Sequence, residues 1–182
     1  MFNLLNREGG IVMEKNIGFV TSLVLGALLV VCSSWSPAEA QNVLNEKNIS
    51  LALAEDAAQA AVMQCRADGF RVTATVLDRS GQIKALLRDD GSGPQTLDTS
   101  RRKAFTSLSF RTSSADFAKM VVTNPAAAGL KDIAGVIALG GGLPIRAGDE
   151  VIGAIGVGGA PGGDKDEACA QAGINRISDR LK

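Results

Sequence analysis

The chain has 182 residues with 19 basic and 19 acidic side chains, so its formal net charge is zero, and it contains neither histidine nor tyrosine. The absence of histidine excludes a Ser-His-Asp triad, a Cys-His dyad and a histidine-based zinc site. The charge is balanced, and Arg101, Arg102 and Lys103 form the one basic cluster that stands out. The sequence therefore gives no sign of a nucleic-acid-binding surface.

Residues 1–40 are typical of an export signal. Lys15 gives a small positive start, and an apolar stretch then runs from residue 17 to residue 31. The sequence AEA at 38–40 matches the small-residue pattern at which export signals are cleaved, which predicts a mature chain that begins at Gln41.

Two other interpretations of this segment stay open. An uncleaved membrane anchor is disfavoured because the apolar stretch is shorter than the roughly 20 residues of a spanning helix. A lipid-modified Cys32 is disfavoured because Val31 stands where a small residue is expected. With cleavage, residues 41–182 are expected to form a single domain of a periplasmic or secreted protein.

Cleavage would leave two cysteines, Cys65 and Cys169. An even pair of cysteines in an exported chain suggests a disulfide. In the chain-entropy model such a bond would stabilise the fold by about 4–5 kcal/mol. Two free buried thiols are the alternative.

The spacing of apolar residues predicts a helix, a hairpin and a second helix in the first half of the mature chain. Residues 48–68 carry apolar side chains three or four apart and are followed by Gly69, which is typical of an amphipathic helix with a glycine at its end. Residues 71–88 alternate on either side of Gly81, which predicts a β-hairpin. Residues 95–110 return to helical spacing.

The second half begins with a short helix and continues with strands. Ser113, with an aspartate three residues later, predicts a helix start, and Asn124 with Pro125 predicts its end. Residues 126–132 are expected to form a loop. Three strands are then expected, and they cover 133–139, 143–146 and 150–157.

The last predicted element is a helix capped by Asp164, with Glu167 at its third position. The resulting order, α-β-β-α-α-β-β-β-α, predicts an α/β (α+β) fold in which helices cover an antiparallel sheet. The first and last helices carry small-residue faces that contain Cys65 and Cys169. If these helices lie side by side, the two cysteines can meet.

Ten glycines lie between residues 140 and 163, which raises the question of a phosphate-binding loop. The dinucleotide frame that starts at Gly156 fails at Pro161, and no Gly-Lys-Ser/Thr ending is present. Glycines in a strand instead indicate that another backbone, a helix or a ligand approaches closely. A capping carboxylate at Asp164 would also occupy the amides that a phosphate needs. The stretch is therefore interpreted as backbone geometry.

Three motifs, DGSGPQT…RRKAFTSLSF, LKDIAGVIALGGGLPI and VIGAIGVGGAPGGDKDEACA, resemble the HbpS/GlcG family of extracellular haem-binding and haem-degrading proteins. The C-terminal domain of PduO-type adenosyltransferases is similar. The resemblance covers about residues 50–181. It implies a profilin-like, five-stranded antiparallel sheet with helices on both faces. It also implies haem binding, assembly into homo-oligomers such as octamers and, for some members, cooperation with a membrane sensor kinase.

The resemblance implies that Thr106 is an iron ligand, because a threonine has this role in HbpS-like members and Thr106 in KAFT is the best match. A mid-helix threonine can instead bond back to a carbonyl one turn earlier. The other candidate haem-binding residues are a soft axial ligand, two ring-packing aromatics and basic partners for the propionates: Met120, Phe105, Phe110, Arg101, Arg102, Lys103 and Arg111. Core packing and a solvated cationic face are the alternatives for these residues.

Several carboxylates are candidate ligands for hard cations such as iron(III) or calcium. They are Asp78, Asp89, Asp90, Asp164, Asp166 and Glu167. A turn position for Asp78 and a helix cap at Asp164 are structural roles that compete with metal binding.

The sequence thus predicts an exported haem-binding protein that senses, buffers or slowly degrades haem. The lack of histidine and tyrosine leaves few general acid–base groups, so a binding protein is favoured over a demanding enzyme. One alternative is an accessory protein of an oxidation pathway that binds a small metabolite or another cofactor. Another is a structural protein whose oligomeric surface is its function.

Overall fold

The structure is a computed structural model that describes residues 44–182. The predicted export signal lies outside the described residues, and so do Cys32 and the predicted cleavage site before Gln41. In the described part, no helix has both the length and the apolar character needed to cross a bilayer.

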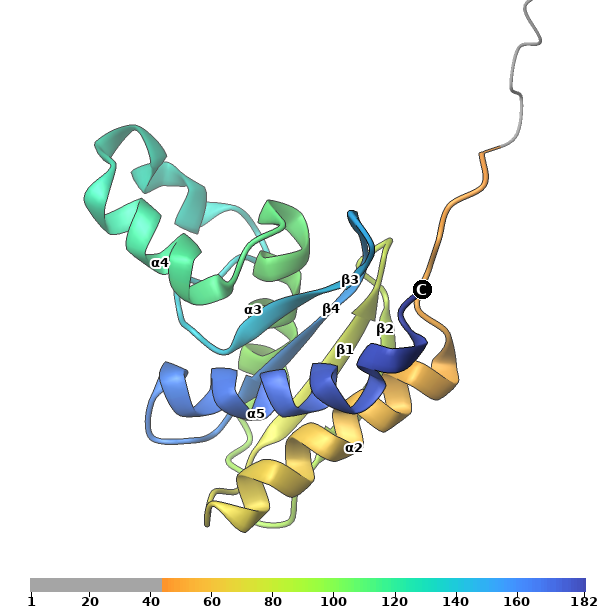
Figure 1. The fold of residues 1–182 in the computed structure, drawn as a ribbon. Helices are drawn as coiled ribbons and strands as arrows, with labels where there is room; N and C mark the ends of the chain where they lie inside the picture. The colour runs from red at the N-terminus through yellow and green to blue at the C-terminus, as the bar shows by residue number, and fades with distance from the viewer. Residues whose placement is uncertain (1–43) are drawn as a thin grey trace, which may run out of the picture. The chain divides into compact units, whose positions relative to one another are not determined.

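One antiparallel sheet and four α-helices form the fold, with element labels as in Figure 1. The strands are β1 (Thr73–Asp78), β2 (Ile83–Arg88), β3 (Gly142–Ala147) and β4 (Glu150–Gly158). The helices are α2 (Leu51–Ala67), α3 (Thr96–Phe110), α4 (Ser114–Thr123) and α5 (Gly163–Ile177), with 3-10 turns η2 (Pro125–Asp132) and η3 (Ser178–Arg180). The strand order is β2-β1-β4-β3, and each neighbouring pair is antiparallel.

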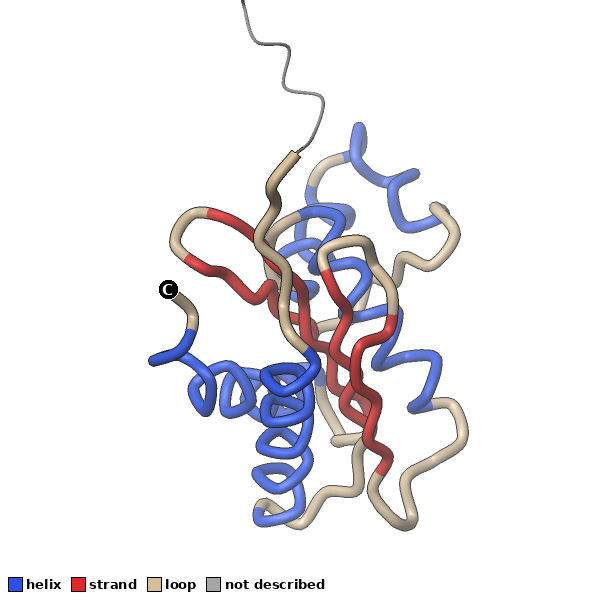
Figure 2. Tube along the Cα trace, turned by 90° about the vertical axis from the view of Figure 1, so that its right-hand side faces the viewer, coloured by secondary structure: helices blue, strands red, loops and turns tan. Residues whose placement is uncertain are grey.

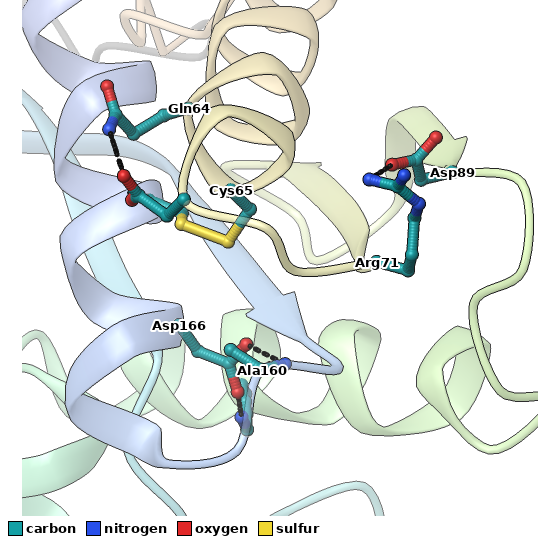
Figure 3. The surroundings of a disulfide bond; sticks show 9 residues. Gln64, Cys65, Arg71, Asp89, Ala160 and Asp166 are labelled. Atoms are coloured by element: carbon teal, nitrogen blue, oxygen red, sulfur yellow. Dashed lines mark hydrogen bonds and ion pairs between the residues drawn. A yellow bond between two sulfur atoms is a disulfide. The ribbon is translucent and has the colours of Figure 1, made fainter.

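Helices α2 and α5 lie side by side on one face of the sheet, and α3 covers the other (Figures 1 and 2). The close contact between α2 and α5 depends on small residues. Ala57 is fully buried, and a Cβ added to Gly173 would lie 2.6 Å from the carbonyl oxygen of Ala57. Cys65 and Cys169 meet across this contact and form a disulfide (Figure 3). The predicted pairing is therefore confirmed.

Helix α3 rests directly on backbone at the opposite face. A Cβ at Gly156 would overlap the carbonyl oxygen of Ser100, and one at Gly142 would overlap that of Lys103. The glycines of β3 and β4 thus seat the helix, as the interpretation of close backbone approach predicted.

The sheet has four strands, so the prediction of a fifth strand over 133–139 is wrong. This segment packs along α3, and side chains of that helix bind its backbone. The guanidinium of Arg102 donates to the carbonyl oxygen of Val136 at 2.6 Å. The Ile137 N–H donates to the hydroxyl of Thr106 at 2.9 Å. These hydrogen bonds replace those that a strand partner would supply. The loop predicted over 126–132 lies within η2 instead.

Candidate functional site

Two clefts flank helix α3. The larger one, of about 420 Å³, lies between the β1–β2 turn, the C-terminal half of α3 and the β3–β4 turn. It is named here the arginine cleft, and its principal lining residues are Arg79, Gly81, Phe105, Leu108, Ser109, Arg111, Arg146 and Glu150. This volume is within the range of small-molecule sites in proteins.

The apolar wall of the arginine cleft comes from α3. Phe105 and Leu108 are three residues apart on this helix and lie on the same side of it. The Phe105 ring lies against two glycines, since a Cβ at Gly81 would be 3.5 Å from it and one at Gly135 would be 3.2 Å from it. Both glycines have a positive φ, a backbone conformation that glycine adopts more readily than other residues. Because they carry no side chain, the backbone can turn close to the ring.

The cationic wall consists of Arg79, Arg111 and Arg146. Arg79 is paired with Glu150 at 3.0 Å, and Arg146 donates to the carbonyl oxygen of Arg111 at 2.7 Å. Within residues 44–182 the Arg111 guanidinium has no ion-pair partner. The cleft therefore combines an apolar wall with two guanidinium groups. That of Arg111 has no ion-pair partner in the described residues, and that of Arg146 donates to the neutral carbonyls of Arg111 and Asp149.

Of the predicted haem-binding residues, Phe105 and Arg111 lie in this cleft. Phe110 stacks on Phe117 with ring centroids 4.3 Å apart, and Met120 packs in the same apolar cluster beneath α4. Arg101 pairs with Asp98 at 3.0 Å. The predicted set is thus divided among the cleft, a small core and the helix surface.

Thr106 is fully buried, and its hydroxyl is engaged on both sides. It donates to the carbonyl oxygen of Arg102 one turn earlier at 2.8 Å, as the structural alternative predicted, and it accepts from the Ile137 N–H. Its assignment as an iron ligand stays a prediction. Such a role would require that the hydroxyl first be uncovered.

Sequence reasoning missed Arg79, Leu108 and Arg146 as cleft residues. The two arginines stand at hairpin ends 67 positions apart, and only the pairing of β1 with β4 and of β4 with β3 brings them together. No local motif marks such a convergence. The helical phase of Leu108 relative to Phe105 was the one usable signal.

The candidate cation ligands are spread over the fold. Asp78 accepts the amide hydrogens of Ser80 and Gln82 at 2.9 and 3.0 Å, and so it stabilises the hairpin turn. Asp164 lies in the first turn of α5, and Gly162 occupies the N-cap, so the predicted cap is wrong. No group of three or more Cys, Asp or Glu side chains suited to a metal occurs in the described part of the chain.

Asp89 is buried at the end of β2, where it joins the C-terminus of α2 to the sheet. Arg66 donates from Nε at 3.2 Å and also contacts the second oxygen. Arg71 lies 3.8 Å from Asp89 (Figure 3). The hydrogen bond from Arg66 holds the pKa of Asp89 below its ordinary value, although burial opposes this effect.

This lowered pKa predicts an acid-sensitive contribution to stability. Since folded Asp89 binds a proton more weakly than the unfolded carboxyl, its stabilisation is present above a pH of about 3.9 and is lost as the pH falls through the folded pKa. We expect Asp89→Asn to lower the urea midpoint near neutral pH, with a difference that shrinks in acid. Urea melts across this range test it. The exposed Asp164→Asn is the control, and a constant difference for Asp89→Asn would contradict the prediction.

The smaller cleft, of about 330 Å³, lies on the other side of α3 and is named here the glycine cleft. Its principal lining residues are Gln95, Thr99, Lys103, Leu139, Gly140, Ala160, Gly162 and Asp166. Lys103 and Asp166 form an ion pair of 2.6 Å in which both side chains are more than nine-tenths buried. The other oxygen of Asp166 accepts from the Ala160 N–H at 3.0 Å (Figure 3). Burial raises the pKa of Asp166, and Lys103 opposes that shift.

A family model described as haem degrading protein HbpS-like matches residues 49–175. Among the curated proteins, none matches the chain. Among solved structures, a double mutant of HbpS from Streptomyces reticuli is 40% identical, with a TM-score of 0.71 over 76% of this chain and 92% of that one. Protein ORFY of Klebsiella pneumoniae is 27% identical, with a TM-score of 0.71 over 75% and 95%.

A third solved structure, a PduOC–haem complex, is 22% identical, with a TM-score of 0.66 over 71% of this chain and 95% of that one. At this identity the likeness concerns the fold alone. The residues matched by the family model, 49–175, include the four strands, helices α2 to α4, most of α5 and the loops that line the two clefts.

Proposed function

This chain belongs to the HbpS-like family of haem-degrading proteins, and from that premise we propose that it binds haem in the arginine cleft. The observation that carries the proposal is the pairing of an apolar wall with Arg111, which has no ion-pair partner within residues 44–182. Haem is a flat apolar ring with two carboxylates at one edge. A site for it needs the same two kinds of surface side by side.

The residues of the cleft fit the two parts of haem separately. Phe105 and Leu108 would pack on the macrocycle, where apolar burial contributes about 25 cal/mol per Å². Arg111 and Arg146 would donate charge-assisted hydrogen bonds to the propionates. When bound, the haem would supply a redox-active iron.

The cleft offers weak donors for that iron. The chain has no histidine or tyrosine, and the Thr106 hydroxyl is buried between α3 and the backbone of Ile137. Ser80 and Ser109 supply hydroxyls in the cleft lining, and of its two carboxylates, Asp149 and Glu150, the second is already paired with Arg79. We therefore infer that the protein would hold the haem iron through a weak or exchangeable ligand. This property suits sensing, buffering or slow degradation of haem better than rapid turnover. From the predicted export signal we also propose that the protein acts in the periplasm or outside the cell. We also propose that the protein forms a homo-oligomer and that it acts with a membrane sensor partner.

The first test is a haemin titration of the purified protein, followed by the Soret band. We expect a saturable, stoichiometric shift, and we expect Arg111→Ala to weaken binding by about tenfold because a charge-assisted bond is lost. Arg101→Ala, which removes the same charge from the exposed side of α3, is the matched control. Absence of a saturable shift would overturn the haem proposal, and equal affinities for the two variants would move the site away from this cleft.

A second test separates the cleft from the predicted threonine ligand. Thr106→Ala should leave the Soret maximum of the complex unchanged, because the cleft does not use the buried hydroxyl. The substitution should cost about 1–3 kcal/mol of folding free energy, because it leaves the Ile137 N–H without its acceptor. Absorbance spectra and urea melts measure the two effects. A Soret shift in Thr106→Ala, with Met120→Ala unchanged, would support iron ligation by Thr106 instead.

A further inference from the structure

The glycine cleft holds a buried ammonium whose hydrogen-bonding capacity is only partly used. The Lys103 side chain is 6% exposed, and its single hydrogen bond within residues 44–182 is to Asp166. An ammonium carries three N–H donors. Two of them therefore have no acceptor within residues 44–182, and Lys103 lines the cleft. A buried charge in this state requires an acceptor from water or from a ligand.

Two helix N-termini open onto the same cleft. Helix α3 begins after Gln95 and α5 begins after Gly162, and neither N-cap residue supplies a side-chain hydrogen bond to its helix. Some first-turn amides are already used, since the Thr96 N–H donates to the carbonyl oxygen of Gly93 and the Lys165 N–H to that of Gly162. Within residues 44–182 the amides of Gly163 and Asp164 at the start of α5 have no acceptor, and the helix dipole favours negative charge there. Both helices have 15 residues, so each one carries the dipole of a helix of about four turns.

The charges around the cleft leave room for one anionic group. Asp166 is the one carboxylate in the lining, and Lys103 together with the Ala160 N–H already satisfies it. Its charge is balanced by that of Lys103. The exposed first-turn carboxylates of α3 and α5, Asp98 and Asp164, are paired with Arg101 and Lys165. The helix N-termini and the remaining ammonium donors therefore set the local preference. Both of these favour an oxyanion.

We propose that the glycine cleft binds a small organic carboxylate. The carboxylate would accept hydrogen bonds from Lys103 and from first-turn amides of α5, and its short carbon chain would contact Leu139, Ala160 and Pro161. Inorganic phosphate fits less well, because no arginine lines the cleft to bind it bidentately and its apolar residues would have no partner. This site is separate from the arginine cleft and does not depend on haem binding.

The test uses propionate and butyrate as probes and the Nζ resonance of Lys103 as the readout. We expect a saturable shift with both acids and none with propionamide, which has the same shape without the charge. A response to propionamide equal to that of propionate, or no saturable response to either acid, would overturn the proposal. Tighter binding of inorganic phosphate than of both acids would overturn its assignment to carboxylates.

A variant at the mouth of the cleft avoids breaking the buried ion pair. Leu139 is 49% exposed, so Leu139→Asp should fold and should weaken propionate binding by at least about tenfold through charge repulsion. Ile133→Asp adds the same charge at a residue of 48% exposure outside the lining and should leave binding unchanged. Retained propionate binding in Leu139→Asp would count against the site. An unchanged haemin response in this variant is expected, because the two clefts are independent.

Discussion

Replacing both cysteines with alanine, Cys65→Ala with Cys169→Ala, is expected to lower the free energy of unfolding by about 4–5 kcal/mol. The bond closes a loop over a sequence separation of 104, so its loss releases a large amount of conformational freedom in the unfolded chain. For a domain of this size that change is a large fraction of the total stability. Both cysteines are fully buried, and so the replacement also removes packing between α2 and α5.

Urea denaturation of the oxidised protein, the reduced protein and the double variant measures this contribution. We expect the midpoint to fall on reduction and the m-value to rise, because an unfolded chain without the cross-link exposes more surface. The double variant should have a urea midpoint close to that of the reduced protein. A small further decrease is expected from the packing lost with the two sulfur atoms. Equal midpoints for the oxidised and reduced forms would show that packing of α2 on α5 alone holds this layer together.

Removing the charge of Lys103 is the second change with a large expected effect. Lys103→Met leaves the Asp166 carboxylate buried without its cation, which is expected to cost about 3–5 kcal/mol. Lys131→Met is the matched control, because the Lys131–Asp132 pair has a similar distance, 2.8 Å, but is exposed. A surface pair of this kind contributes about 0–1 kcal/mol.

A double-mutant cycle separates the pair from its two members. Lys103→Met combined with Asp166→Leu removes both charges, and we expect much of the lost stability to return. The melts of the two single variants and the double variant give the coupling free energy. Additive losses would mean that Lys103 and Asp166 contribute through separate contacts, which would contradict the charge-pair explanation.

The basic cluster at 101–103 illustrates what a sequence alone does and does not determine. Neighbouring residues on a helix point about 100° apart, so three consecutive cations cannot share one surface. Arg101 faces an aspartate at the surface, Arg102 binds a backbone carbonyl, and Lys103 is buried. The helix was predictable from its apolar spacing, but the separate partners of these side chains come from segments distant in sequence.

The segment 133–139 shows the same limit for secondary structure. Its apolar, β-branched composition favours a strand, and that local preference is real. The segment does not form a strand because Arg102 and Thr106, on a helix about 30 positions earlier, bind its backbone. Capping at Ser113 was predictable, because its hydroxyl accepts from the Asp116 N–H three residues later. At Asp164 the same pattern failed because α5 already begins at Gly163, with Gly162 as its N-cap.

The backbone seat of α3 has a consequence for how this protein can change over evolutionary time. Because Gly142 and Gly156 touch the main chain of the helix, no side chain at the seat can shrink or grow to accommodate a turned helix. One residue inserted in its first turn would rotate everything after it by about 100°. Phe105 would leave one cleft and Lys103 the other in the same event. Length variation in this family should therefore accumulate in the connecting loops and spare α3.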